Sequence, residues 1–178
     1  MMHKPFVYQT IDIPNYQEIH QELVSLAVAQ QPRFSWTFNH LDPALVLDHC
    51  PGIAAWFRSQ CLEPRASVLI LQPPGADHKG VHTDTTQDLL ALNFGIANLL
   101  DTWCAFYTLK RGKPVSRALP PGPAWQHYEH ADLEEIGRID LVKPTLINVC
   151  IPHAVHNPTQ DTRISVSFRF TQNPWHLL

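Results

Sequence analysis

Two side chains of metal-ligand type stand close together in the stretch GVHTDTTQD, where one threonine separates His82 from Asp84. On an extended strand, residues at this spacing point to the same side, so the imidazole and the carboxylate can bind one ion together. The pair follows the apolar run SVLIL and a Pro-Pro-Gly turn, and it precedes the apolar run LLALNFGI. These flanks place the pair at the mouth of a predicted sheet and predict two ligands of a metal site.

A third ligand is expected from a later strand that neighbours the first one in space. The stretch TLINVCIPHAV delivers His153 at the end of such a strand, and His156 follows three residues later as a rival. A neutral imidazole is a common ligand for transition metals, so both histidines qualify by chemistry. On residue type alone, either one can complete the site.

An arginine and a serine follow these histidines on the predicted strand RISVSFRF. Arg163 and Ser165 are two residues apart, so their side chains share one face of the strand. A guanidinium offers a planar fork of donors that can bind a carboxylate through two hydrogen bonds, and a hydroxyl adds a further donor. The other face of this strand is apolar. The alternation by itself also fits a half-exposed strand whose polar face meets water.

A second His-x-Asp pair, His130 and Asp132, occurs in the stretch YEHADLEEIG. Three glutamates crowd this pair, and the stretch is typical of a solvated turn or a short helix. We therefore interpret it as a chance match rather than a metal site.

The elements that must position these residues change character along the chain. Capping residues and apolar spacing predict helices over residues 16–30, 43–49 and 52–62. From Ala66 onward, short branched and aromatic runs separated by Pro, Gly and Asp predict a β-sandwich or barrel. The runs are ASVLIL, LLALNFGI, TWCAFYTL, RIDLV, TLINVCI and RISVSFRF. Residues 110–125, with four basic residues and four prolines, are expected to form a long loop.

Length and composition limit the classes of protein. The 178 residues, 44% of them hydrophobic, are enough for one core, so we expect a single domain over 1–178. The net charge of -3 disfavours a nucleic-acid partner, because it gives no field that attracts phosphates. No apolar run approaches the length of a membrane span, so no membrane partner and a cytoplasmic location are expected. Four widely spaced cysteines without a CxxC pair are read as reduced thiols.

The ordered set of these motifs resembles the iron(II)- and 2-oxoglutarate-dependent oxygenases. In that family an H-x-D pair and a distant histidine bind Fe(II), and a downstream arginine, often in R-x-S, binds the far carboxylate of 2-oxoglutarate. Arg163 follows His153 by ten positions, the usual spacing in the family, whereas it follows His156 by seven. The flanks HAV, N and RIS also match the H-x-V…N…R-x-S run of family members. The resemblance thus favours His153 as the ligand, with His156 as the alternative.

The resemblance extends over about residues 66–170 and implies a mainly β fold with N-terminal helices, a double-stranded β-helix (a cupin-like jelly roll). Residues 66–170 would form this core, residues 1–65 would pack on its sheet, and residues 171–178 would be a C-terminal tail. The chain is loosely similar to the aspartyl/asparaginyl β-hydroxylases, which lack the ligand aspartate that this chain keeps as Asp84.

The resemblance also implies cofactors, roles and a reaction. The cofactors are Fe(II), O2 and 2-oxoglutarate as co-substrate. The metal ligands would be His82, Asp84 and His153, and 2-oxoglutarate would be bound by Arg163 and Ser165, with Asn93 and Tyr107 as further candidates. Hydroxylation of a small molecule or a peptidyl side chain, with release of succinate and CO2, or another oxidation such as desaturation, is favoured over halogenation, because relatives that halogenate replace the ligand carboxylate.

Three other functions fit parts of the sequence. A cupin on a similar barrel is disfavoured because the H-x-H start of cupins does not occur here. A non-catalytic jelly-roll binding module would make the histidines incidental. A nucleic-acid demethylase on the same fold would use the basic residues Lys110, Arg111, Lys113 and Arg117, against the acidic balance of the chain.

Overall fold

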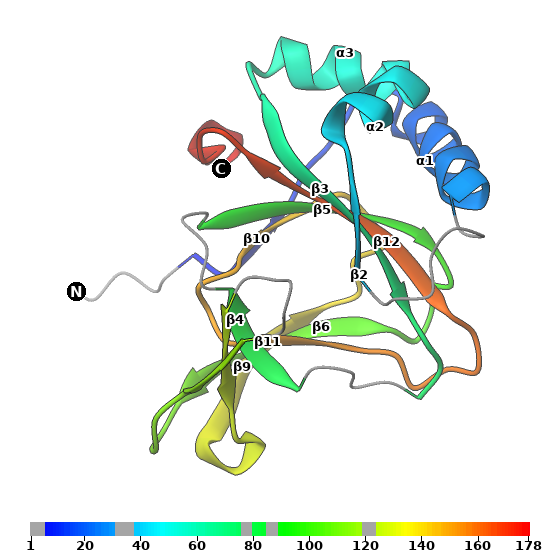
Figure 1. Cartoon of the computed structure of the whole chain (residues 1–178). Helices are drawn as coiled ribbons and strands as arrows, with labels where there is room; N and C mark the ends of the chain where they lie inside the picture. The colour runs from blue at the N-terminus through cyan, green and yellow to red at the C-terminus, as the bar shows by residue number, and fades with distance from the viewer. Residues whose placement is uncertain (1–5, 31–37, 76–79, 85–88, 119–123) are drawn as a thin grey trace.

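Two six-stranded antiparallel sheets face each other in the computed structural model (Figure 1). The structure describes residues 6–30, 38–75, 80–84, 89–118 and 124–178. Sheet I contains, in spatial order, β1 (Tyr8–Thr10), β10 (Thr145–Asn148), β5 (Leu90–Ala97), β12 (Arg163–Phe170), β3 (Pro64–Gln72) and β2 (Phe38–Leu41). Sheet II contains β7 (Val115–Ala118), β8 (Ala124–Tyr128), β4 (Val81–Asp84), β11 (His153–His156), β6 (Trp103–Leu109) and β9 (Leu133–Ile139). The predicted mainly β fold is confirmed.

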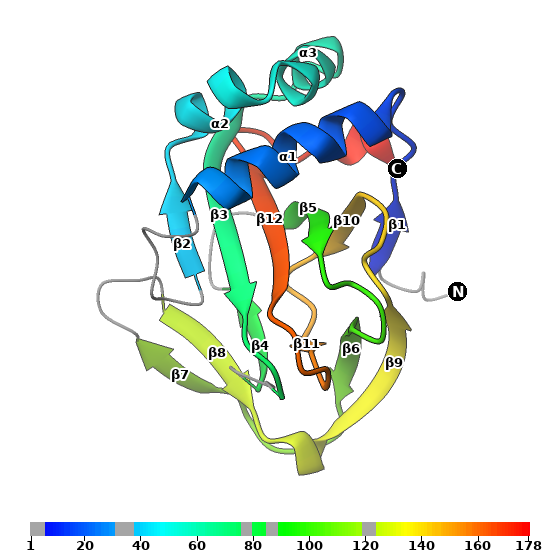
Figure 2. The ribbon, with the colours of Figure 1, turned by 90° about the vertical axis from the view of Figure 1, so that its right-hand side faces the viewer.

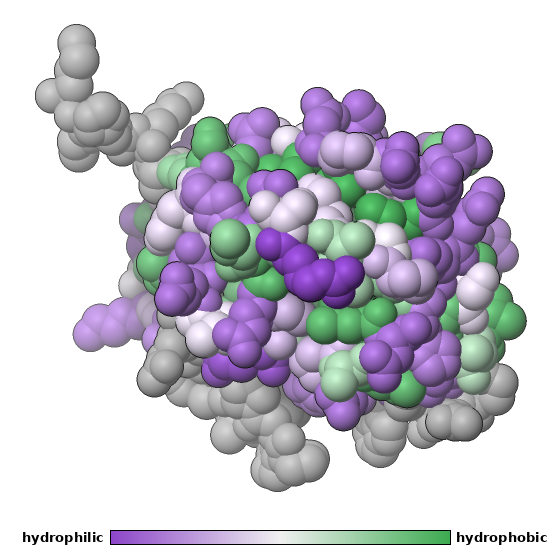
Figure 3. All heavy atoms as spheres, turned by 90° about the horizontal axis from the view of Figure 1, so that it is seen from above, coloured by the Kyte–Doolittle hydropathy of each residue, from purple (hydrophilic) through white to green (hydrophobic). Residues whose placement is uncertain are grey.

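Three helices cover the outer face of sheet I (Figure 2). They are α1 (Tyr16–Gln30), α2 (Pro43–His49) and α3 (Pro51–Ser59), and short 3-10 turns η2 (His130–Asp132) and η3 (Trp175–Leu177) occur later. The predicted bounds of α1 and α2 are confirmed, and Asp42 caps α2 by accepting a hydrogen bond from Ala44 N at 2.9 Å. Polar side chains are spread over the surface seen from the side of the helices (Figure 3). None of the described helices is long and apolar enough to cross a membrane.

The main hydrophobic core lies between these helices and sheet I. Strand β12 turns its apolar residues toward the helices, where the ring of Phe57 from α3 meets Phe168 and Phe170 edge-on at 5.1 and 5.2 Å. The buried aromatic area holds α3 on the sheet. Because side chains alternate along a strand, the polar residues of β12 must point the other way, toward sheet II. The packing of β12 therefore places its donors in the interior between the sheets.

One prediction about the second half of the chain was wrong, and another is confirmed only in part. Residues 110–125 do not form one loop, because β7 and the first two residues of β8 lie within this segment and the two strands pair antiparallel; residues 119–123 lie outside the described residues. Pro114 directly precedes β7, an edge strand of sheet II, where a missing N–H group is tolerated. The stretch YEHADLEEIG was interpreted as a solvated turn or short helix, and this is confirmed for His130–Asp132, which form the 3-10 turn η2, whereas its last five residues belong to strand β9 (Leu133–Ile139).

Candidate metal centre

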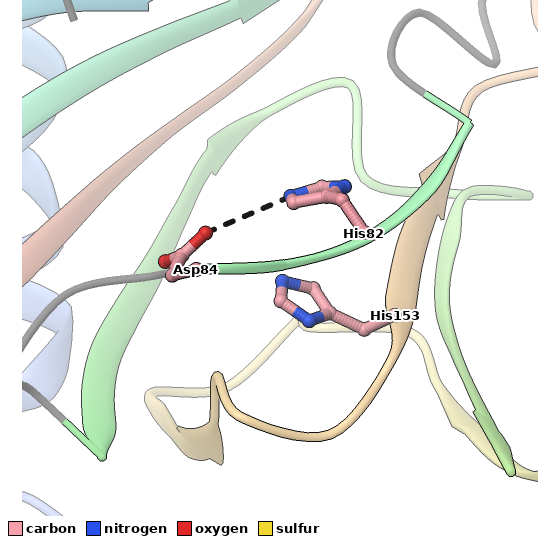
Figure 4. Close-up of side chains that lie close together, drawn as sticks. All are labelled: His82, Asp84 and His153. Atoms are coloured by element: carbon pink, nitrogen blue, oxygen red, sulfur yellow. Dashed lines mark ion pairs between the residues drawn. The ribbon is translucent and has the colours of Figure 1, made fainter. Parts of the chain in front are cut away.

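Side chains from two neighbouring strands of sheet II converge between the sheets. His153 of β11 lies directly opposite His82 of β4 in the antiparallel register, and the two imidazole rings are 4.6 Å apart. Asp84 follows His82 on the same face of β4, and Figure 4 shows the three side chains pointing toward one another. One ligand atom from each lies within 4.8 Å of the other two. The structure thus brings His82, Asp84 and His153 together in a group that could hold a metal ion.

Backbone carbonyl groups orient both imidazoles. The Nδ1 atom of His82 lies 3.2 Å from Gly80 O, and Nδ1 of His153 lies 2.9 Å from Ile151 O. A carbonyl oxygen only accepts, so each Nδ1 donates its hydrogen and the lone pair stays on Nε2. The Nε2 atom of His82 faces Asp84 Oδ1 at 3.8 Å. Both rings therefore hold the tautomer in which Nε2 can bind an ion.

The ionisation states at the cluster also suit a cation. Burial lowers the pKa of His153, although the charge of Asp84 opposes this effect, so the imidazole is neutral at neutral pH, as a ligand must be. Burial works against ionisation of Asp84, but the charge and the hydrogen bond of Arg169 oppose this effect, and the pKa of this carboxyl lies below its usual value. Two histidines and one carboxylate are the donor set of mononuclear iron sites that keep open positions.

The spacing of the donors fits one ion after a small adjustment. Two donors at right angles on an ion with bonds near 2.1 Å lie about 3 Å apart. The distance of 3.8 Å between His82 Nε2 and Asp84 Oδ1 is longer than this separation, but a rotation of the side chains is enough to close the difference. The three residues therefore fit a mononuclear centre.

Arg169 of β12 contacts the carboxylate of Asp84 at the cluster. Its NH2 group donates to Asp84 Oδ2 at 2.6 Å, and its NH1 group donates to Ser167 Oγ at 2.7 Å. The alternation along RISVSFRF places Arg169 on the same face as Arg163 and Ser165, but no motif in the sequence indicates its partner. The contact joins β12 of sheet I to β4 of sheet II, a pairing that no local pattern could have revealed.

Arg163 begins the same inward-facing row and is buried, with 2% of its surface exposed. Its NH1 group donates to Ser165 Oγ at 3.0 Å, while Nε and NH2 have no hydrogen-bond partner among the described residues. Burial lowers the pKa of Arg163 to about 10, so the group still carries its charge at neutral pH. A buried charge without an opposite charge beside it costs roughly several kcal/mol, so this arrangement favours the binding of an anionic ligand.

Asn93 of β5 also lies in this interior. It stands opposite Ser167 of β12 on one side and Thr145 of β10 on the other, and it is 8% exposed. Its Nδ2 group donates to Ala91 O at 3.2 Å. The structure therefore brings Asn93 to the same face of sheet I as Arg163 and Ser165.

Two other residues that the sequence analysis named do not join the cluster. Alternation along β11 and β6 sends His156 and Tyr107 to the outer face of sheet II, whereas His153 faces inward. The Tyr107 hydroxyl lies 3.1 Å from His156 Nε2, and the His156 ring stacks on Trp103 at 5.2 Å. Neither side chain can reach the metal-binding cluster without crossing the sheet.

Comparisons with known proteins agree with this fold. No protein-family model matches the chain, and no curated protein matches it. The structure of SnoN, a non-heme alpha ketoglutarate dependent epimerase from nogalamycin biosynthesis, is similar over 90% of this chain and 76% of its own, with 14% identity and a TM-score of 0.53. At this identity the likeness establishes the fold, and it confirms the predicted double-stranded β-helix.

Two further solved structures match at lower scores. The non-heme monooxygenase ThoJ matches 92% of this chain and 71% of its own, at 13% identity and a TM-score of 0.48. A Pseudomonas putida prolyl-4-hydroxylase matches 92% of this chain and 90% of its own, at 14% identity and a TM-score of 0.43. The loose similarity to aspartyl/asparaginyl β-hydroxylases gains no support from these structures.

Proposed function

We propose that the protein is an Fe(II)- and 2-oxoglutarate-dependent dioxygenase. The observation that carries this proposal is the buried guanidinium of Arg163, which has no carboxylate partner among the described residues. It lies in the same interior as a cluster of two histidines and one aspartate. A dicarboxylate that binds a metal through its keto acid end and an arginine through its far carboxylate satisfies both features at once.

Each residue has a defined role in this proposal. His82, Asp84 and His153 hold the metal through Nε2, a carboxylate oxygen and Nε2, respectively. Arg163 binds the far carboxylate of 2-oxoglutarate, and Ser165 supports the guanidinium through the 3.0 Å contact. The low exposure of Arg163 and Ser165 keeps water from competing for the carboxylate. When bound, Fe(II), O2 and 2-oxoglutarate supply the oxidising power, with succinate and CO2 as by-products.

For the substrate we propose a small molecule or a peptidyl side chain, and hydroxylation as the reaction. The presence of Asp84 supports hydroxylation, because a ligand carboxylate fills the position that a halide would need. The interior location of the cluster supports a substrate that inserts a narrow group between the sheets. A cytoplasmic location and a single domain over residues 1–178 stay predictions of the sequence.

The proposal is tested by adding Fe(II) and 2-oxoglutarate to the protein without oxygen and recording the visible charge-transfer band of the chelated keto acid. We expect the band in the wild type and in His156→Ala, because His156 lies on the outer face of sheet II. His153→Ala should lose the band, since it removes an inward-facing donor. Absence of the band in the wild type under all conditions would contradict the proposal and favour a binding module.

A further inference from the structure

We infer that Arg169 is a positioning residue that restricts Asp84 to one metal-bound oxygen. This inference rests on the proposed function and deepens it, because it concerns how the same centre keeps its open positions. Arg169 belongs to sheet I and Asp84 to sheet II, so the contact spans the interior rather than a single strand pair. The side chain of Arg169 is only 18% exposed, and that of Asp84 is only 13% exposed.

The geometry separates the two oxygens of Asp84. Oδ2 accepts the hydrogen bond from the Arg169 NH2 group at 2.6 Å, whereas Oδ1 faces Nε2 of His82 at 3.8 Å. A hydrogen bond between a guanidinium and a carboxylate is charge-assisted and stronger than a neutral one. Oδ2 is thus held on the side of sheet I while Oδ1 is presented to the histidines. Ser167 in turn holds the guanidinium by accepting from NH1 at 2.7 Å.

The number of oxygens that bind decides how many positions remain open. A carboxylate can bind a metal through one oxygen or through both, and the second mode occupies an additional position. A centre that must take two atoms of a keto acid and one more ligand needs three open positions beside three protein donors. Occupation of Oδ2 by Arg169 favours the one-oxygen mode and so keeps the third position open.

The source of the support distinguishes Asp84 from the histidines. Carbonyl groups of the backbone orient His82 and His153, so no side-chain substitution removes those contacts. Among the described residues, the support of Asp84 comes from a side chain and can be removed by mutation. Arg169 is therefore the place where the orientation of a ligand can be changed without changing a ligand.

The test uses the full-length protein as Arg169→Gln, Arg169→Lys and the control Arg138→Gln. The control breaks an ion pair of similar length, Arg138 with Glu135 at 2.7 Å, outside the centre. Each variant is titrated with Co(II) alone, and the d–d absorption of the bound ion is recorded. We expect Arg169→Gln to weaken Co(II) binding by about 10- to 100-fold, in line with other supports of metal ligands.

The spectrum reports the geometry independently of affinity. If Asp84 becomes free to bind through both oxygens, the coordination number rises and the d–d absorptivity of Co(II) falls in Arg169→Gln. Arg169→Lys keeps the charge but loses the planar fork that spans Asp84 and Ser167, so it should restore part of the affinity and little of the absorptivity. Arg138→Gln should match the wild type in both measurements.

Different outcomes separate this inference from the proposed function. Wild-type affinity and wild-type absorptivity in Arg169→Gln would overturn the inference while leaving the proposed function intact, provided that the wild type shows the keto acid band. If the wild type binds neither Co(II) nor Fe(II), both fail. Should Arg169→Gln not fold, as judged by circular dichroism, Ser167→Ala serves instead, because it loosens the guanidinium and retains its charge. A Ser167→Ala spectrum identical to that of the wild type would then overturn the inference.

Discussion

Arg163 and Arg169 lie six residues apart on the inward face of β12, and each donates a hydrogen bond to a serine on the same strand, Ser165 or Ser167. Among the described residues, Asp84 pairs with Arg169, and no carboxylate pairs with Arg163. Arg163 is also the more deeply buried of the two. Arg169 is thus neutralised by a carboxylate of the protein, whereas Arg163 has no such partner among the described residues and can bind an anionic ligand.

Replacement of Arg163 tests directly whether this guanidinium binds 2-oxoglutarate. Arg163→Gln should weaken the binding of 2-oxoglutarate to the metal-loaded protein by about 2–5 kcal/mol, roughly 30- to 5,000-fold, because a buried charge pair is lost. Co(II) binding in the absence of 2-oxoglutarate should be unchanged, since Arg163 is not among the clustered donors. Calorimetric titration measures both affinities.

Ser165→Ala is a milder test of the same site. It removes one contact of the guanidinium, at 3.0 Å, and retains the charge, so the loss of 2-oxoglutarate affinity should be smaller. An Arg163→Gln protein that binds 2-oxoglutarate like the wild type would mean that the carboxylate binds elsewhere.

Asn157 should be needed for the loop that leads into Arg163. It is 1% exposed, and its Nδ2 group lies within 3.1 Å of three carbonyl oxygens, those of Gln72, Pro73 and Asp161. Asn157→Ala leaves these acceptors without their donor, at an expected cost of about 1–3 kcal/mol in the free energy of unfolding. Asn157→Asp should cost more, because a carboxylate would face the carbonyl oxygens. Urea denaturation measures both.

Asn98→Gly is the control for that experiment, because Asn98 has a φ of 54° and glycine accepts this left-handed backbone without strain. Asn98 supports the same loop with a single exposed contact, from Nδ2 to Thr162 O at 2.7 Å. Its loss should cost less than that of Asn157. Equal costs for the two variants would show that burial of the amide is not what makes Asn157 important.

The two-residue period of side chains along a strand predicts which residues of the candidate site lie on the same face. Because residues two apart share a face, the sequence predicts that His82 joins Asp84 and that Arg163 joins Ser165, and the structure has both pairs facing the interior. The same rule separates His153 from His156, since three residues on a strand put them on opposite faces. The parity of this spacing shows that only one of the two histidines can join the cluster, but each face of HAVH pairs a histidine with an apolar residue, so the pattern does not say which one.

Other parts of the site could not be derived from local patterns. Both faces of TWCAFYTL carry apolar side chains, so the sequence does not indicate which face of β6 is internal, and Tyr107 was named although it lies outside. The contact between Arg169 and Asp84 joins positions 85 residues apart on different sheets. Such a contact depends on how the sheets stack, which the pattern of a single strand does not encode.

Glu22 should stabilise the start of a helix to which it does not belong. Both of its carboxylate oxygens accept from Gly52 N in the first turn of α3, at 3.1 and 3.0 Å, and the N-cap residue Cys50 makes no side-chain cap hydrogen bond. A carboxylate at this place satisfies an unpaired N–H group and favours the helix dipole. Glu22→Ala should therefore cost about 1 kcal/mol, or roughly 2–4 °C in the melting temperature.

Glu22→Gln separates the two contributions, because it keeps an acceptor and loses the charge. Its melting temperature should lie between those of Glu22→Ala and the wild type. Gln21→Ala changes the exposed neighbour on α1 and should leave the melting temperature within about 1 °C of the wild type. A Glu22→Ala protein as stable as Gln21→Ala would contradict the proposed cap.

The four thiols should divide into two reactive and two protected groups. Cys61 and Cys150 are exposed, whereas Cys50 and Cys104 are buried. Burial raises the pKa of Cys104 to about 12 against the opposing charge of Arg163, and burial together with the charge of Glu22 raises the pKa of Cys50 to about 12. The thiolate is the reactive form, and a raised pKa means that it appears only at higher pH, so both buried groups remain thiols at pH 8.

Alkylation with iodoacetamide at pH 8, followed by mass spectrometry of the peptides, measures this division. Cys61 and Cys150 should be labelled in the native protein, and Cys50 and Cys104 should be labelled only after unfolding in guanidinium chloride, where all four react. Raising the pH from 7 to 9 should leave Cys50 and Cys104 unlabelled in the native protein, because both pH values lie well below the pKa of these two thiols. Rapid native labelling of Cys104 would show that the interior beside Arg163 opens to solvent, and it would remove the exclusion of water on which carboxylate binding at this guanidinium depends.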